Sequence, residues 1–354
     1  MNQLKAMAIA SLLLATASVC IAGGADVKIK MWKLPSDTHY PHDPLVSHDG
    51  YIWYTGNKSN NIGRFDPRTE TFKEWSTDIP NSGPHGIVED KDGNIWFTAN
   101  MAKPTYIGKF DPHTEKFTVY PIKLAARSDN DPEAAGAHTL TFDQKGNIWF
   151  TMLNSDMIGR LDPRTGKFTI ARSAQHPVGP YGIVVNSKGV PFFTMFRTNK
   201  LGSIDPDTMA VRLYEIPNAD ARPRRLTIAP DDVVWYTDFE RGMLGRFDPQ
   251  TGSFSEWPSP GGAWSRPYPL LVIGNAVWYN ESWLTPTTIV RFDIETHQTQ
   301  SWPVENCDDG MYLFYPDRDG FWFTCHGTDR LGKVEINEGG SAAKISAGAG
   351  KGGR

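Results

Sequence analysis

The sequence has little cysteine, no excess of charge of one sign and no long hydrophobic run after its first residues. Three of the 354 residues are cysteines, and 36 lysines and arginines against 40 aspartates and glutamates give a net charge of −4. Without a basic block, the chain lacks the electrostatic footprint of a protein that binds nucleic acid or an anionic membrane surface. We therefore expect no nucleic-acid partner and no membrane span. We expect the protein to be a monomer and its ligand to be a small molecule.

The one apolar run lies at the N-terminus. Residues 1–22 carry Lys5 near the start, apolar residues over Ala6–Leu14 and a small residue, Ala22, at the end. This pattern predicts a secretory signal peptide, and with these flanks it is too short for a spanning helix. We place cleavage after Ala22; lipidation at Cys20 is the alternative, which the residues before it disfavour. The expected location is the periplasm or the outside of the cell.

After cleavage, two cysteines remain, Cys307 and Cys325. An oxidising compartment permits a disulfide between them. If residues 317–320 form the turn between two strands, Cys325 lies opposite about Tyr312, so a bridge requires residues 305–310 to fold back. The sequence leaves both outcomes open.

What the chain does contain is a repeat of 43 to 53 residues, in which an aromatic pair is followed, in most copies, by an apolar-Gly-basic-apolar-Asp phrase. The anchor aromatics are Trp53, Trp96, Trp149, Phe192, Trp235, Trp278 and Trp322, at steps of 43, 53, 43, 43, 43 and 44. A period in the low forties built of short aromatic strands and turns is typical of β-propellers, with one four-stranded blade per repeat. The sequence therefore predicts an all-β, seven-bladed propeller.

The two ends of the repeat array are complementary. The seventh repeat stops near Ile336 without an outer strand, whereas residues 27–35, before the first blade, match the outer-strand phrase of other repeats. We predict that this N-terminal strand completes blade seven and hides two sheet edges. The expected organisation is a signal peptide over 1–22, the propeller over 23–336 and a disordered tail over 337–354.

In a propeller the first strand of each blade lines the central channel. The seven residues that lie eleven positions before the anchors should therefore form one ring around the axis. The ring is His42, His85, His138, Tyr181, Arg224, Tyr268 (offset by one) and Met311. Four residues after the last anchor comes His326, in blade seven, which ring closure places beside blade one.

Two arcs of this ring suggest different chemistry. Neutral imidazoles at His42, His85 and His138 suit a transition metal or a proton-transfer site. Across the channel, Tyr181, Arg224 and Tyr268, with Arg197 and Arg225 nearby, suit an anionic or carbonyl-bearing ligand. The alternative is structural, because a histidine can fill the channel and hydrogen-bond a neighbouring carbonyl. The sequence leaves this alternative open.

The repeat phrases resemble the streptogramin B lyase family, the virginiamycin B lyase-like proteins, over about residues 30–336. The phrases that carry the resemblance are Pro84-His85-Gly86-Ile87, Gly93-Asn94-Ile95-Trp96-Phe97-Thr98, Ile62-Gly63-Arg64 and Ile158-Gly159-Arg160. The resemblance implies a seven-bladed propeller that opens a cyclic depsipeptide ester by Mg²⁺-assisted β-elimination, removing a proton α to a carbonyl.

The functional set of that family comprises a Tyr on the ring position of blade one, a His on that of blade six, and in blade seven a Glu-Pro-His-Gly phrase and a later Glu. Here the blade-one position is His42 and the blade-six position is Tyr268, while Asp309-Gly310-Met311 stands at the blade-seven phrase and His326 replaces the later Glu. The resemblance thus makes His326, His42 and Tyr268 catalytic candidates. It also adds Asp309 to His42, His85 and His138 as a metal candidate.

The combined expectation is a metal-assisted lyase acting on a cyclic or ester-bearing small molecule. The family resemblance implies Mg²⁺, whereas the histidine arc favours a transition metal. Two alternatives are a non-catalytic ligand-binding or scaffold propeller and a metal-dependent lactone or ester hydrolase. Because the family's catalytic positions are changed, we expect poor streptogramin lyase activity.

Overall fold

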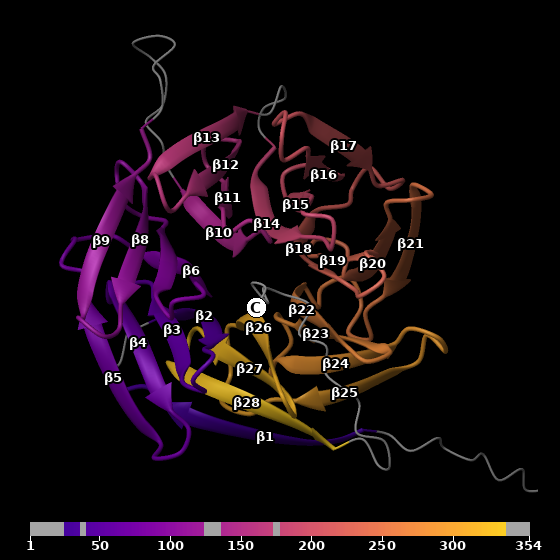
Figure 1. Cartoon of the computed structure of the whole chain (residues 1–354). Coiled ribbons are helices and arrows are strands. Elements are labelled where there is room, and N and C mark those ends of the chain that lie inside the picture. Colours follow the sequence, from indigo (N-terminus) through magenta and orange to yellow (C-terminus); the bar gives the residue numbers. More distant parts are fainter. Residues whose placement is uncertain (1–24, 36–39, 124–135, 173–177, 338–354) are drawn as a thin grey trace, which may run out of the picture.

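Seven four-stranded sheets surround a central channel (Figure 1). The computed structural model describes residues 25–35, 40–123, 136–172 and 178–337, and these residues form strands and turns without a helix. The seven-bladed propeller predicted from the repeat is confirmed. The expected signal peptide and residues 338–354 of the expected tail lie outside the described residues, while Asn337, which was assigned to the tail, ends the last strand.

Each blade runs from an inner strand at the channel to an outer strand at the rim. In six blades the four strands follow one another along the chain. Blades one to three are β2 (Pro41–Val46), β3 (Ile52–Gly56), β4 (Asn61–Asp66) and β5 (Thr71–Ser76); β6 (Pro84–Glu89), β7 (Ile95–Ala99), β8 (Tyr106–Asp111) and β9 (Lys116–Pro121); β10 (Ala137–Phe142), β11 (Ile148–Met152), β12 (Met157–Asp162) and β13 (Lys167–Arg172). Blades four to six are β14 (Pro180–Val185), β15 (Pro191–Met195), β16 (Lys200–Ile204) and β17 (Val211–Glu215); β18 (Pro223–Ile228), β19 (Val234–Asp238), β20 (Met243–Asp248) and β21 (Ser253–Pro258); β22 (Pro267–Ile273), β23 (Ala276–Glu281), β24 (Thr288–Asp293) and β25 (Thr299–Pro303). Blade seven combines β26 (Met311–Asp317), β27 (Gly320–Cys325) and β28 (Arg330–Asn337) with β1 (Asp26–Lys33).

The repeated phrase encodes packing between and within blades. Trp53 is buried, and its ring lies 5.8 Å from that of Phe110 in the next blade, so the anchor aromatics form the inter-blade core. In six blades the aromatic residue after the anchor lies over a glycine of the third strand, whereas blade six has Val290 opposite Tyr279. A Cβ on Gly63 would come within 2.0 Å of Tyr54, so a side chain at Gly63 would displace the Tyr54 ring.

The N-terminal strand closes the ring. Strand β1 pairs antiparallel with β28 from Asp26 opposite Asn337 to Lys33 opposite Arg330. In Figure 1 it crosses the outer edge of blade seven beside β28. The Trp32 ring stacks on Trp322 at 5.4 Å and lies 5.0 Å from Phe65 of blade one. This confirms the predicted closure and joins the first described strand to the last.

The two mature cysteines are bonded. Cys307 and Cys325 form a disulfide with a Cα–Cα distance of 5.2 Å. The residue opposite Cys325 in the sheet is Met311, one position from the Tyr312 expected. The bond forms because the segment before β26 folds back over β27. The sequence had left open whether this segment does so.

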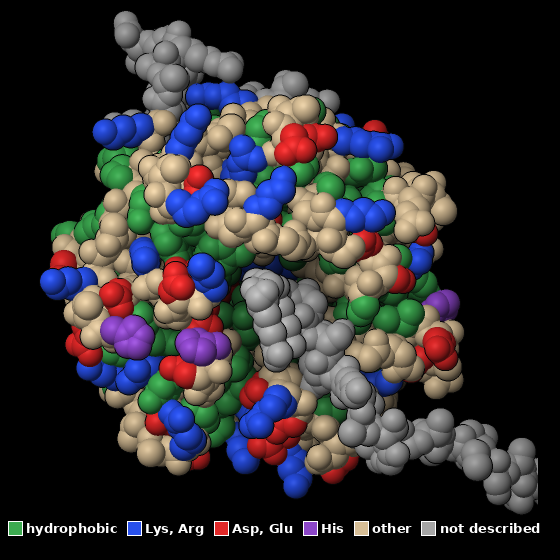
Figure 2. All heavy atoms as spheres, viewed as in Figure 1, with side chains coloured by type: hydrophobic (Ala, Val, Ile, Leu, Met, Phe, Trp, Pro, Cys, Tyr) green, Lys and Arg blue, Asp and Glu red, His purple; other side chains and the backbone are tan. Residues whose placement is uncertain are grey.

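The surface is mixed in charge. Acidic and basic side chains both appear across the face in Figure 2, consistent with a net charge of −4. Among the described residues, no helix has the length and apolar character that a membrane crossing requires.

Candidate functional site

A bulge at the start of each inner strand shapes the channel mouth. In blade one, Pro41 lies opposite Gly56 and Pro44 opposite Tyr54, so His42 and Asp43 occupy the irregular step between them. The same shift recurs at the start of the inner strand in every other blade. A bulge re-aims side chains locally, and here it lets two consecutive residues reach the channel.

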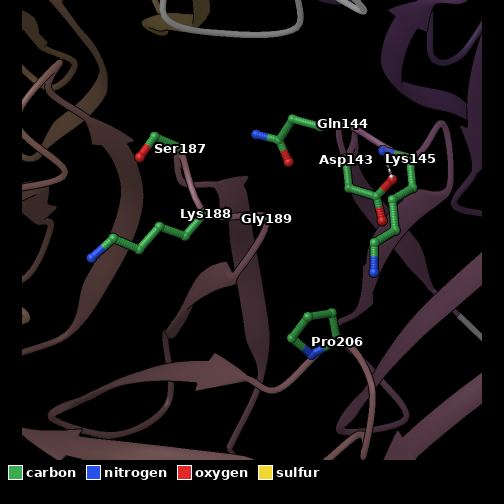
Figure 3. A pocket seen from close by; sticks show the side chains of 7 residues that line it. All are labelled: Asp143, Gln144, Lys145, Ser187, Lys188, Gly189 and Pro206. Atoms are coloured by element: carbon green, nitrogen blue, oxygen red, sulfur yellow. Dashed lines mark hydrogen bonds between the residues drawn. The ribbon is translucent and has the colours of Figure 1, made fainter.

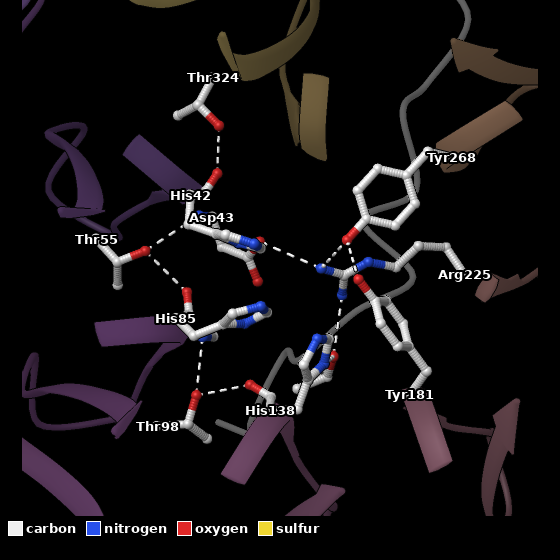
Figure 4. Close-up of polar contacts among 12 residues, drawn as sticks. His42, Asp43, Thr55, His85, Thr98, His138, Tyr181, Arg225, Tyr268 and Thr324 are labelled. Atoms are coloured by element: carbon white, nitrogen blue, oxygen red, sulfur yellow. Dashed lines mark hydrogen bonds and ion pairs between the residues drawn. The ribbon is translucent and has the colours of Figure 1, made fainter. Parts of the chain in front are cut away.

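A belt of threonine hydroxyls holds the ring residues in place. Thr55 Oγ1 donates to the carbonyl of His85 at 2.8 Å, and Thr98 Oγ1 to that of His138 at 2.6 Å (Figure 4). Equivalent bonds to the next blade come from Thr151, Thr194, Thr237 and Thr324. The threonine two residues after the anchor, which the repeat spacing did not mark as functional, therefore fixes the ring backbone of the neighbouring blade.

The structure brings the three ring histidines together. The ring centroids of His42 and His85 lie 3.6 Å apart, and those of His85 and His138 lie 3.9 Å apart. All three side chains are buried. Burial holds their pKa values well below the ordinary range, and the nearby guanidinium of Arg225 lowers them further. The imidazoles are therefore neutral at physiological pH.

Arg225 extends into the channel from the side opposite His42 and His85 (Figure 4). It is 3% exposed; its Nη2 lies 3.4 Å from Asp43 Oδ1 and 3.3 Å from the Tyr268 hydroxyl, and its Nη1 donates to Thr139 Oγ1 at 3.0 Å (Figure 4). Burial raises the pKa of Asp43, and the Arg225 charge opposes that shift. The channel thus contains an ion pair between blades five and one. The repeat spacing marks one residue per blade, so it placed Arg225 only near the site.

The opposite arc surrounds Arg224 with aromatic rings. Its Cζ lies 4.1 Å from the ring centroid of Phe239, 4.4 Å from Tyr268 and 5.0 Å from both Tyr181 and Phe196. The Tyr181 and Tyr268 hydroxyls hydrogen-bond to each other at 2.6 Å. Within the described chain, Arg224 has no carboxylate within ion-pair distance, and its buried Nε has no hydrogen-bond partner. The arc therefore carries an uncompensated positive charge.

In blade seven the ring residue is Tyr312, which corrects the expectation of Met311. Met311 is fully buried in the core between blades, whereas the Tyr312 ring lies 4.0 Å from His42 and 5.6 Å from Tyr268. The cause is a two-residue hairpin loop after Asp317, which shortens the distance in sequence between the ring residue and the anchor Trp322 by one residue. The hairpin loop after Ile273 has the same effect in blade six.

His326 lies at the rim of the mouth. Its ring is 4.5 Å from both Tyr312 and Tyr40, and burial lowers its pKa to about 4. The carboxylate of Asp309 acts on it in the opposite direction. Asp309 itself is exposed on the loop before β26, with a φ of 66°, and it is not part of the histidine cluster.

The donor atoms at the channel do not suit Mg²⁺. Within the described ranges, one group of metal-ligating side chains is close enough to hold an ion: His42, Asp43 and His85, with ligand atoms within 4.8 Å of one another. Mg²⁺ requires oxygen ligands in near-octahedral geometry. This group offers two imidazoles, and its one carboxylate already pairs with Arg225. The Mg²⁺ that the family resemblance implies is therefore a poor fit to these residues.

A hollow of about 190 Å³ lies away from this site (Figure 3). It is lined by Asp143, Gln144, Lys145, Ser187, Lys188, Gly189 and Pro206. Most of these residues follow the C-terminal ends of inner strands, whereas the ring residues lie at the N-terminal starts, so the hollow opens on the other face. Asp143 accepts hydrogen bonds from two backbone amides and the Trp149 indole of its own hairpin, which is turn chemistry.

Comparison with known proteins identifies relatives of this architecture. The sequence profile of the Virginiamycin B lyase family matches residues 107–347. Virginiamycin B lyase from Staphylococcus aureus superposes with a TM-score of 0.78 at 23% identity, covering 88% of this chain and 100% of that one. A streptogramin B lyase structure gives a TM-score of 0.77 at 25% identity, with 88% and 98% covered.

A third structure is a catalytically inactive histidine-to-alanine variant of the Staphylococcus aureus lyase with quinupristin. It has a TM-score of 0.78 and 22% identity, and the match covers 88% of this chain and 100% of that one. Among curated proteins, none matches this sequence significantly.

Proposed function

This chain belongs to the virginiamycin B lyase family, and we propose that it binds an ester-bearing small molecule at the channel mouth and opens it by β-elimination. The observation that carries the proposal is the uncompensated guanidinium of Arg224 in a ring of aromatic side chains. A ligand carbonyl or carboxylate there gains a charge-assisted hydrogen bond, and its apolar parts contact the surrounding rings.

Charge at the mouth favours such a ligand. The three ring histidines are neutral, and Asp43 balances Arg225, so Arg224 leaves a net positive charge. An anionic or strongly polarised oxygen is attracted to this charge. In a β-elimination, negative charge develops on the oxygen of the carbonyl next to the carbon that loses its proton. Arg224 is suited to stabilise that developing enolate.

His326 is the side chain best placed to act as base. Its pKa of about 4 keeps the imidazole neutral at physiological pH, so a ring nitrogen has a lone pair to accept a proton. Contacts run from His326 through Tyr312 and Tyr268 to Arg224 around one mouth. His326 takes the proton from the α carbon, a double bond forms between the α and β carbons, and the β carbon–oxygen bond breaks. The ester oxygen leaves on a carboxylate, without addition of water.

His42 and Tyr268, the other two catalytic candidates, have supporting parts in this proposal. The Tyr268 hydroxyl lies between Tyr181 and Arg225 and orients the anionic end of the ligand together with Arg224. His42 contacts Tyr312 from the blade-one side. The tyrosines at the blade-six and blade-seven ring positions cannot replace histidine as a base near neutral pH, since burial raises the pKa of both. We accordingly propose that streptogramins are poor substrates.

The test is ring opening of a type B streptogramin and of simpler depsipeptide lactones, followed by mass spectrometry. An elimination product keeps the mass of the substrate, whereas a hydrolysis product gains one water. His326→Gln should abolish turnover with binding retained, and Arg224→Gln should weaken binding. Binding without turnover of any lactone would favour the ligand-binding alternative, and a product with added water would favour the hydrolase.

We further propose that the protein is exported to the periplasm or beyond. The buried disulfide between Cys307 and Cys325 supports this, because such bonds form and persist in oxidising compartments. Fractionation of the native host with an antibody against the propeller tests it; recovery in the cytoplasm would contradict export.

A further inference from the structure

The histidine arc opposite Arg224 has a feature that the proposed elimination does not use. His85 is 5% exposed, and its buried Nδ1 has no hydrogen-bond partner within the described chain. The flanking rings differ: His42 Nδ1 bonds Asp43 at 2.8 Å, and His138 Nδ1 lies 3.0 Å from Thr139 Oγ1. A buried ring nitrogen without a partner is destabilising, unless a ligand occupies it.

The geometry points to a binding site for a divalent transition-metal ion, with Zn²⁺ as the probe, formed by His42, Asp43 and His85 beside the ring of His138. The ligand atoms of the three residues lie within 4.8 Å of one another. Imidazole–zinc bonds of about 2.1 Å place two ligands at most about 4.2 Å apart, so small side-chain rotations complete the site. The elimination proposed for Arg224 and His326 does not require this ion, although His42 belongs to both.

The surroundings already orient these ligands. His42 Nδ1 lies 2.8 Å from Asp43 Oδ1. An ionised carboxylate only accepts, so this contact favours the tautomer with hydrogen on Nδ1, whose Nε2 lone pair is available to a metal. The threonine belt fixes the backbone carbonyl of His42 from Thr324 and that of His85 from Thr55. A site whose ligands are positioned before the ion arrives loses less conformational entropy on binding.

Charge and donor type decide which ion binds. The Arg225 guanidinium, 3.4 Å from Asp43 Oδ1, takes up part of the carboxylate charge. The remaining attraction comes from imidazole nitrogens, which bind Cu²⁺, Ni²⁺ and Zn²⁺ far more strongly than Mg²⁺ or Ca²⁺. The site therefore selects against the ion that the family resemblance implies.

The experiment uses the full chain, stripped with EDTA and dialysed. We titrate Zn²⁺ and Mg²⁺ by calorimetry and record the visible d–d spectrum after adding Co²⁺. We expect one Zn²⁺ per chain, tetrahedral-type Co²⁺ absorption, and Mg²⁺ binding at least about 100-fold weaker. His85→Gln, which keeps volume and neutrality, should weaken Zn²⁺ binding about 100-fold or more.

The matched control is His48→Gln. His48 lies outside the channel with a 69% exposed side chain, paired to Glu89 at 2.7 Å, so this change should leave Zn²⁺ affinity unaltered. Circular dichroism and melting of both variants show that they fold. Equal Zn²⁺ affinity in wild type and His85→Gln, or loss of binding in His48→Gln, would overturn the proposal. Zinc binding and lactone opening are separate readouts, so either proposal can fail alone.

Discussion

Closure of the ring by the N-terminal strand depends on Trp32, and its replacement by alanine measures how much that closure contributes. The Trp32 ring stacks on Trp322 at 5.4 Å within blade seven and lies 5.0 Å from Phe65 in blade one. It thus connects the first strand to two blades at the closing interface. Truncation to alanine removes both ring contacts and leaves apolar surface of both partners open to water.

The magnitude follows from the degree of burial. Replacing a fully buried tryptophan by alanine costs about 3–5 kcal/mol, and Trp32 is only partly buried, so we expect about 3 kcal/mol. For a propeller of this size, about 2 °C per kcal/mol gives a melting temperature lower by about 6 °C. Chemical denaturation followed by tryptophan fluorescence and far-ultraviolet circular dichroism measures the free energy of unfolding.

The control lies in the same strand. Lys30 pairs with Glu335 at 3.1 Å across β1 and β28, but its side chain is 58% exposed. Lys30→Ala should therefore cost less than about 1 kcal/mol. If the two variants lost equal stability, Trp32 would not hold the closure. A chain beginning at Ser36 should aggregate, because it exposes the β28 edge; a soluble truncated protein with unchanged melting would refute closure by this strand.

Three further predictions concern the channel and blade seven. Asp43→Asn leaves Arg225 buried without its carboxylate and should lower the free energy of unfolding in urea by about 3–5 kcal/mol. The double variant Asp43→Asn/Arg225→Met should recover most of that stability. If the single and double variants lost equal stability, Asp43 would not compensate the charge of Arg225. Replacing Cys307 and Cys325 by alanine should cost about 3 kcal/mol, since the bond closes a loop of 18 residues, and unchanged melting would show that other contacts hold the segment. The folded pKa of His326 is about 4 against an ordinary 6.5, so as pH falls through 6.5 the unfolded state takes up a proton first. Stability should decline between pH 6.5 and 4 by about 3 kcal/mol from this group, and His326→Gln should flatten that slope; an unaltered slope would show that His326 titrates normally.

Much of the candidate site could be located from spacing, because a repeated strand presents the same position to the channel in every blade. His42, His85, His138, Tyr181 and Arg224 were placed on one ring in this way, and the structure brings them to one channel mouth. Figure 4 shows the first four of them. Counting back from the anchor works as long as the hairpin between the first two strands keeps its length.

Spacing failed where the hairpin or the strand was irregular. Two-residue turns in blades six and seven shift the ring position by one, which puts Tyr312 rather than Met311 at the channel. The bulge that brings Arg225 and Asp43 into the channel is a departure from period-two alternation, so the alternation of side chains along a strand cannot reveal it. The pairing of these two residues adds a contact across the axis between blades far apart in sequence.

The architecture was already encoded in local patterns of the sequence: seven aromatic anchors at a nearly constant period, glycines that admit an aromatic ring in most blades, and an N-terminal segment that matches the missing strand. These features are local or repeated, and each is dictated by the packing of one blade on the next. Four features emerge only in three dimensions: the filling of the channel, the pairing of Arg225 with Asp43, a ring nitrogen of His85 without a partner among the described residues, and the bond from Cys307 to Cys325. Those facts depend on side chains meeting across the axis and on the path of an irregular loop, and no repeat in the sequence constrains either.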